Sequence, residues 1–264
     1  MAIITISRGS YSRGKEVAEK VAAKLGYECI SRDILIEASE QFNIPEIKLV
    51  RAIHDAPSIL ERFTYGKERY VAYLKAALMK HVQKDNVVYH GLAGHYFLQD
   101  VPHVLKVRIV ADLEDRIAEE MKREKISAAE ARHILKKDDD ERRRWGIQVF
   151  GVDTWDPMLY DMVLHIKSIS VDCAVDLILQ AIKYPCFQTT APSQKMLDEQ
   201  TLAARVQAAL VEEFPTAKVS TKGEELFVDI KADLTKEQEV IARVRRIANR
   251  VAGIEVKLKT SIHP

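Results

Sequence analysis

Hydrophobic residues recur along this chain with two spacings, and together they predict an α/β protein. Apolar runs rich in β-branched residues at 3–8, 86–91 and 104–110 predict buried strands. Between these runs, apolar residues recur every four positions, as at Val17 and Val21, which is typical of amphipathic helices. Buried strands that alternate with helices predict a parallel sheet covered by helices on both faces.

The C-terminal part of the chain has a different pattern. A helix near residues 197–213 precedes two strands near 218–220 and 226–230, a second helix after 235 and a final strand over 254–258. Apolar and polar positions alternate in the strands, which predicts one face against helices and one in water. The order αββαβ in about seventy residues describes a small second domain, near the lower size limit for independent folding.

Local signals place several helix ends. Ser127 and Glu130 form a capping box for a helix to about Lys137, and Thr235 with Gln238 forms a second one. Glycine is expected to end the helix after the first turn, at Gly26, and the helix that begins at Thr235, at Gly253.

The composition between Tyr184 and Gln194 shifts to Pro, Thr, Ser and Gln, which is typical of a linker. We therefore expect a first domain over residues 1–184, a linker over 185–196 and a second domain over 197–264.

Bulk composition narrows the function classes. The chain has 264 residues, 47% of them hydrophobic, and a net charge of +1, so no global field favours nucleic acid and none is expected as a partner. Three scattered cysteines lack metal-binding spacing and indicate reduced thiols. A strand predicted from residue 3 leaves no room for a signal peptide, so we expect a cytoplasmic protein.

The turn after the first strand carries the strongest functional signal. Gly9, Gly14 and Lys15 fit the phosphate-loop spacing G-x-x-x-x-G-K between a strand and a helix. Backbone N–H groups and the positive end of the helix dipole can hold phosphate oxygens there. Glu16, however, occupies the position of the Ser or Thr hydroxyl that usually reaches magnesium.

Three segments together resemble the cytidylate kinase-like branch of the P-loop nucleoside monophosphate kinases. They are the opening at residues 3–18, the strand and turn at 87–95, and the segment from 107 to 164, which includes Asp115-Arg116-Ile117 and Phe150-Gly151-Val152-Asp153. The order and spacing make the resemblance specific over residues 1–183. It implies a three-layer αβα P-loop fold with helical monophosphate-binding and lid regions.

The resemblance leaves two registers open for the loop. The family alignment places Gly14 where the phosphate-binding lysine usually sits, whereas the literal motif gives that role to Lys15. In either register the cations around the loop could neutralise phosphates. The expected nucleotide-binding residues are Arg8, Gly9, Ser12, Arg13, Gly14, Lys15 and Glu16.

The resemblance also implies where an acceptor monophosphate and a lid would lie. Asp33, Gly91 and Asp139 are the expected substrate-binding residues, although Leu92 replaces an arginine that related proteins usually carry. Lys15, Arg142 and Arg123 are the expected catalytic residues.

Asp139 and Arg142 match the family's D-x-x-R spacing. A solvated helix face with i,i+4 pairs such as Asp138–Arg142 or Asp139–Arg143 explains the same charges and stays an alternative.

Other polar residues have weaker assignments. Asp33 or Asp112 could hold magnesium through water, Asp112 because it follows a buried strand. His95 is expected to be an ordinary packing residue, and Trp155 to pack on a helix or stack on a base.

Three hypotheses follow for the whole chain. The first is ATP- and Mg²⁺-dependent phosphoryl transfer to a nucleoside monophosphate such as CMP. The second is a weak or inactive nucleotide sensor with a degenerate loop. In the third, the C-terminal unit, which resembles a BON domain, docks the kinase-like domain on a small ligand, a protein or a lipid surface.

Overall fold

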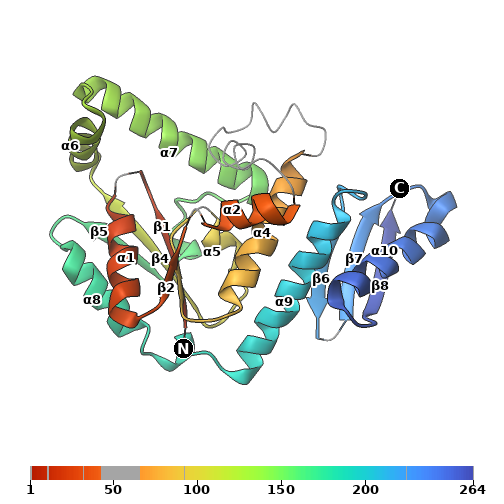
Figure 1. Ribbon diagram of the computed structural model, residues 1–264. Helices are drawn as coiled ribbons and strands as arrows, with labels where there is room; N and C mark the ends of the chain where they lie inside the picture. Colours follow the sequence, from red (N-terminus) through yellow and green to blue (C-terminus); the bar gives the residue numbers. More distant parts are fainter. Residues whose placement is uncertain are drawn as a thin grey trace. The chain divides into compact units, whose positions relative to one another are not determined.

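The computed structural model (Figure 1) describes residues 2–10, 12–31, 33–42, 66–91, 93–223 and 225–263, without the side chains of residues 33, 35 and 66–68. The chain forms two compact units. The first holds residues 2–33 and 84–190, and the second holds 34–42, 66–83 and 191–263. Within the described residues, no helix is both long and apolar enough to cross a bilayer.

The first unit is built on a five-stranded sheet in which every pair is parallel, as the buried runs predict. The strand order is β2-β3-β1-β4-β5, so β1 lies at the centre with β3 and β4 beside it. The carboxyl end of β1 therefore lies between the carboxyl ends of β3 and β4, the edge at which parallel sheets bind their ligands. The strands are β1 (Ile3–Arg8), β2 (Glu28–Ile30), β3 (Val87–Tyr89), β4 (Val104–Ala111) and β5 (Met162–Ile166).

One face of this sheet packs on two helices that lie side by side, α1 (Gly14–Leu25) and α8 (Val171–Ala181) (Figure 1). Val17 and Val21 of α1 are fully buried, which confirms the four-residue spacing in the sequence. Helix α1 ends at Gly26, whose φ of 67° is the left-handed conformation that glycine adopts without strain.

Two charged helices, α6 (Leu113–Glu124) and α7 (Ala128–Phe150), follow β4 and pack on each other (Figure 1). The capping box at Ser127 and Glu130 is confirmed, with both reciprocal hydrogen bonds formed. Helix α7 runs past the predicted end near Lys137, through three aspartates of low helix propensity, because its buried residues continue to Trp145, and the left-handed Gly151 stops it. The first unit also contains a short helix, α5 (Gly94–Phe97), and the turn η2 (Pro157–Leu159).

The second unit contains the αββαβ order that the sequence predicts. Helix α9 (Ala191–Leu210) precedes the antiparallel strands β6 (Lys218–Lys222) and β7 (Glu225–Lys231). Helix α10 (Glu237–Ala252) then leads to β8 (Lys257–His263), which pairs parallel to β7. Within residues 185–196, the turn η3 (Pro185–Phe187) comes before the first residues of α9.

The capping box predicted at Thr235 is wrong. The backbone N–H and the hydroxyl of Thr235 both bond to the carboxylate of Asp233, which caps the turn η4 (Leu234–Lys236), and α10 begins only at Glu237. The last strand also begins later than predicted, because the Asn249 side chain, not a strand neighbour, accepts the Val256 N–H.

Two helices from the first half of the chain also belong to this second unit: α2 (Asp33–Phe42) and α4 (Gly66–Val82). Helix α4 packs along α9, with the Tyr73 hydroxyl 3.1 Å from a Glu212 carboxylate oxygen and the Thr201 hydroxyl 3.5 Å from the Met79 carbonyl oxygen. Tyr73 and Met79 are completely buried. The helix break predicted near Pro57 lies outside the described residues.

Candidate functional site

The phosphate-loop segment lies between the end of β1 and the start of α1, as the motif predicts. Arg13 precedes the helix in a left-handed conformation, with φ of 64°. The buried Ser12 hydroxyl lies 3.0 Å from the Gly9 carbonyl oxygen and 3.1 Å from the Ile109 carbonyl oxygen. This hydroxyl therefore ties the turn to the end of β4.

Gly14 is required for space. A Cβ at this position would lie 2.7 Å from the Arg8 Cβ and 2.9 Å from its Cδ. The Arg8 side chain thus occupies the volume that any residue larger than glycine would need, and the first turn of α1 closes directly on β1.

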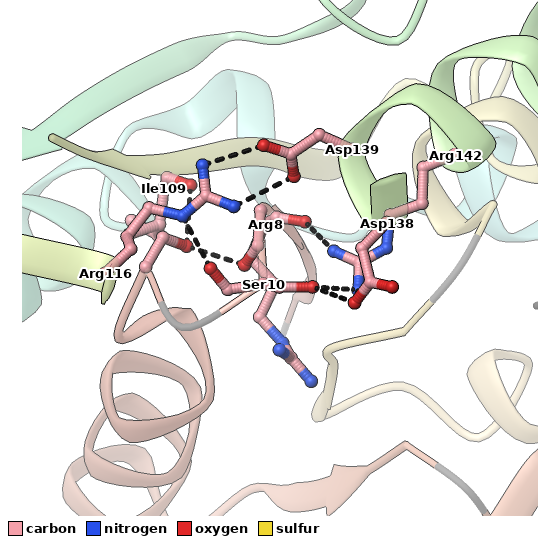
Figure 2. Close-up of polar contacts among 9 residues, drawn as sticks. Arg8, Ser10, Ile109, Arg116, Asp138, Asp139 and Arg142 are labelled. Atoms are coloured by element: carbon pink, nitrogen blue, oxygen red, sulfur yellow. Dashed lines mark hydrogen bonds and ion pairs between the residues drawn. The ribbon is translucent and has the colours of Figure 1, made fainter. Parts of the chain in front are cut away.

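Arg116 of α6 forms the most buried charged contact with the turn. Its guanidinium donates two hydrogen bonds to the Asp139 carboxylate, at 2.8 and 2.9 Å, and its Nε donates to the Ser10 carbonyl oxygen at 2.7 Å (Figure 2). Arg116 is 8% exposed, and its guanidinium lies 3.5 Å from the position of a Cβ on Gly9. Bidentate geometry and burial make this a strong contact.

Arg142 of α7 reaches the same turn from the other side. Its Nη2 lies 2.5 Å from the Ser10 hydroxyl and its Nη1 lies 3.3 Å from the Arg8 carbonyl oxygen (Figure 2). The Ser10 hydroxyl donates in turn to Asp138, at 2.9 Å. The predicted Asp138–Arg142 pair is present at 4.0 Å. Asp139, by contrast, pairs with Arg116 and not with Arg143, which pairs with Asp153.

The predicted charges of α1 lie on its solvent side. Lys15 pairs with Glu19 at 3.6 Å and its side chain is 64% exposed. Glu16 pairs with Arg13 and Lys20. Burial alone would raise the pKa of the Glu16 carboxyl, but hydrogen bonds from these two cations outweigh it and lower that pKa. Glu16 is therefore engaged by two cations close to it in the sequence.

The remaining predicted residues are not brought to the turn by the contacts described. Arg123 pairs with Glu120 and Glu124 of its own helix. At Gly91, the Tyr89 hydroxyl lies 2.3 Å from where a Cβ would be, so the glycine makes room for this ring. Helix α2 begins at Asp33, but the Asp33 side chain, Tyr11 and Leu92 lie outside the described residues.

A pocket of about 290 Å³ adjoins the inner side of the turn. Gly9 and Ser12 line it together with Arg116, Asp139 and the end of β4. Its other lining residues are Arg108, Val110, Ala111, Trp155, Pro157 and Val163.

The site list drawn from sequence omitted Arg116, Arg108 and Ser10. Two signals could have found the arginines: Arg116 stands in the quoted Asp115-Arg116-Ile117 match, and Arg108 interrupts an apolar strand. No motif position marks Ser10 as the residue that both α6 and α7 contact.

The residues of the turn fit the phosphates of ATP, because they combine a helix start with two nearby guanidiniums. The described residues contain no group of three potential metal ligands, yet Mg²⁺ often binds through one or two carboxylates and the nucleotide's phosphates. Asp138 and Asp139 are suited to that role by their place beside Ser10 and Arg116. Asp112 is instead engaged by His165 and Lys167.

Comparison with solved structures finds a shared fold over about two thirds of this chain. It is similar to an uncharacterized protein from Eubacterium ventriosum, with a TM-score of 0.53, 20% identity, and coverage of 69% of this chain and 98% of that chain. It is also similar to a shikimate kinase from Bacteroides thetaiotaomicron, with a TM-score of 0.44, 11% identity, and coverage of 69% and 99%.

Comparison of the sequence with protein families finds a match, and comparison with curated proteins finds none. No curated protein matches this chain. Residues 3–168, however, match the model of the cytidylate kinase-like family, a range that includes the turn, helices α6 and α7 and the whole parallel sheet. The chain therefore belongs to the cytidylate kinase-like family.

Proposed function

We propose that this protein binds ATP at the turn between β1 and α1 and transfers its terminal phosphoryl group to a nucleoside monophosphate such as CMP. The observation that carries the proposal is the convergence of Arg116 and Arg142, from two lid helices, on Ser10. Phosphoryl transfer needs little covalent chemistry from a protein, but it needs fixed positions and compensation of charge on the moving group.

Each part of the site has a role in this proposal. The N–H groups at the start of α1 bind phosphate oxygens, and Ser12 holds the turn in place through β4. Arg116 and Arg142, rather than Lys15, compensate the phosphate charge, because Lys15 is exposed and paired with Glu19. Magnesium, when bound with the nucleotide, supplies further positive charge on the phosphate oxygens.

The two lid carboxylates hold the positions of phosphate oxygens when nucleotide is absent. Asp139 accepts both hydrogen bonds from Arg116, and Asp138 accepts from Ser10. A phosphate offers the same bidentate geometry to a guanidinium. Nucleotide binding thus exchanges a carboxylate partner for a phosphate partner, and closure of the lid excludes water that would compete as acceptor.

Coupled detection of ADP with a panel of nucleoside monophosphates tests the proposal. We expect turnover with one of them, and a loss of about a hundredfold or more in kcat/KM in Arg142→Ala. Arg144→Ala is the matched control, since Arg144 is an exposed residue of the same helix that bonds to the Asp140 carbonyl oxygen. An equal effect of both substitutions would contradict the role of Arg142.

A nucleotide sensor is the second candidate, favoured by the exposed ion pairs that Lys15 and Glu16 form with Glu19 and Lys20. In this case ATP binding is measurable by calorimetry, but no monophosphate gives ADP above background. Calorimetry and turnover on the same preparation separate the two candidates.

We propose further that the αββαβ unit is a BON-like recognition module for a small ligand, a protein or a lipid surface. Its solvent-facing strand positions include Lys218, Lys231 and Lys257. A vesicle sedimentation assay with and without anionic lipid tests the lipid alternative. The cytoplasmic location stays a prediction from the cysteine pattern.

A further inference from the structure

Arg108 is a buried cation that the phosphate-loop motif does not explain. It lies on β4 and is 9% exposed, among residues such as Val107 and Ile109 that are completely buried. A charged group in such a place normally has a carboxylate partner, because removal from water is costly. Within the part of the chain that the structure describes, no carboxylate oxygen lies within ion-pair distance of Arg108.

The partners of Arg108 are three hydroxyl groups, all at one nitrogen. Nη1 lies 3.4 Å from Ser7 Oγ, 3.4 Å from Thr154 Oγ1 and 3.2 Å from Tyr160 Oη. These distances are at the long end for N–H···O hydrogen bonds. Nη1 carries only two hydrogens, so three weak acceptors share them.

The other edge of this guanidinium is available to a ligand. Nε and Nη2 carry three N–H groups, for which the described residues provide no acceptor. Arg108 also lines the pocket of about 290 Å³ next to Gly9 and Ser12. The two nitrogens on this edge have the spacing that binds two oxygens of one carboxylate or phosphate.

The two arginines of this pocket differ in one respect. Arg116 already has a bidentate carboxylate partner in Asp139, whereas Arg108 has none. Asp153 interacts with the charge of Arg108 only beyond ion-pair distance, because its carboxylate pairs with Arg143. His95, which packs against the Tyr160 ring at 5.0 Å between centroids, adds no positive charge beside Arg108. Its own pKa is lowered to about 3 by burial and by the charge of Arg108, so the imidazole is neutral.

The rest of the pocket fits a small molecule with an apolar or planar part. Val110, Pro157 and Val163 supply apolar wall, and the Trp155 ring, half exposed, stands at the same pocket. Its volume is at the lower end of the range for ligand pockets, which suits one small molecule.

We propose that Arg108 binds an oxyanion of the phosphoryl acceptor, a small molecule whose body lies against Trp155 and Val163. This inference rests on the proposed function, since it gives the acceptor a place beside Gly9 and Ser12. The shared chemistry is a carboxylate or a phosphate, and the two sources are separated below.

Binding to wild type, Arg108→Met and Arg108→Lys tests the proposal. The probes for calorimetry are CMP, inorganic phosphate and benzoate, with ATP measured separately. We expect affinity for the acceptor-type probe to fall at least about tenfold in both variants, because lysine keeps the charge but lacks the two-nitrogen edge. ATP affinity should change less than about twofold, and the exposed control Arg144→Met should bind every probe as wild type does.

The probes identify the source of the oxyanion. Arg108-dependent binding of CMP or phosphate assigns a phosphate-bearing acceptor, and Arg108-dependent binding of benzoate alone assigns a carboxylate. Arg108→Lys keeps the test valid if Arg108→Met does not fold, and circular dichroism checks both.

The proposal is overturned if the folded variants bind all probes like wild type, if only ATP binding weakens, or if wild type binds none of the three acceptor probes. Its failure is distinguishable from that of the proposed function. Turnover with an unchanged KM in Arg108→Lys would contradict the role of Arg108 and leave phosphoryl transfer standing. Arg108-dependent CMP binding without ADP formation would support the role of Arg108 and contradict phosphoryl transfer.

Discussion

The two sides of the turn between β1 and α1 carry similar charges in different surroundings. On the outer side, Lys15 and Glu16 form exposed pairs along α1. On the inner side, Arg116 and Asp139 form a pair whose side chains are 10% and 18% exposed. Exposed pairs contribute little, whereas loss of one partner from a buried pair is costly. Burial, and not a place in the motif, therefore decides which charges matter here.

The largest effect is expected when the buried ion pair on the inner side of the turn is removed. In Arg116→Met, Asp139 loses both hydrogen bonds and the Ser10 carbonyl loses its donor. We expect the free energy of unfolding to fall by about 3 kcal/mol and ATP binding to be lost. Urea unfolding and calorimetry measure both. Arg132→Met, which removes an exposed pair with Glu114, is the control and should cost less than about 1 kcal/mol.

The second prediction concerns pH and the neutral His95. Burial lowers its pKa from 6.5 to about 3, so between these values the unfolded chain binds the extra proton. The contribution of His95 to stability is therefore complete above pH 6.5 and is lost as the pH falls, roughly 2 kcal/mol of it by pH 5.

Urea unfolding of wild type and His95→Phe between pH 5 and 7.5 measures this dependence. The variant should have the shallower slope, and a variant at the exposed His133 controls for the loss of one imidazole. Parallel slopes for wild type and His95→Phe would show that burial does not keep this ring neutral.

A smaller effect is expected when the inner side loses a single hydroxyl. Ser12→Ala removes the contact with the Gly9 and Ile109 carbonyl oxygens and should lower the free energy of unfolding by about 1–2 kcal/mol. ATP affinity should fall as well, because the turn is no longer tied to β4. Ser168→Ala, at an exposed serine, should change neither quantity measurably.

The smallest effect is expected when the exposed ion pair on the outer side of the turn is removed. Lys15→Ala removes only an exposed i,i+4 pair, so we expect a change in unfolding free energy below about 0.5 kcal/mol. ATP affinity should change less than about threefold. A loss as large as that of Arg116→Met would show that Lys15 turns inward when nucleotide binds, as the literal motif predicts.

The sequence predicted the parallel sheet, the helix after the turn and the αββαβ order, because apolar spacing reports directly which face of an element is buried. The D-x-x-R spacing singled out Asp139 and Arg142 as lid candidates; in the structure Asp139 bonds to Arg116 and Arg142 bonds to Ser10, and their roles stay predictions. The Thr235 cap failed because the N–H and the hydroxyl of Thr235 both donate to the Asp233 carboxylate, which caps the turn η4 ahead of α10.

The charges at the site were harder to predict. A motif assigns Lys15 a position along the chain, but the direction of its side chain depends on which face of α1 packs on the sheet. Arg108 and Arg116 form hydrogen bonds with residues far along the chain: Thr154 lies 46 positions after Arg108, and Asp139 lies 23 positions after Arg116. Spacing within one segment holds no information about such contacts.

The packing of α4 along α9 has a consequence for how the chain can be truncated. These two helices are separated by more than a hundred residues of chain, so their contact must form late and at a cost in loop-closure entropy. Removal of α9 would expose Tyr73 and Met79 to water. Truncation before α9 would therefore remove the packing partner of α4, a helix within the family-matched residues 3–168, so this part of the matched segment depends on the C-terminal chain for its stability.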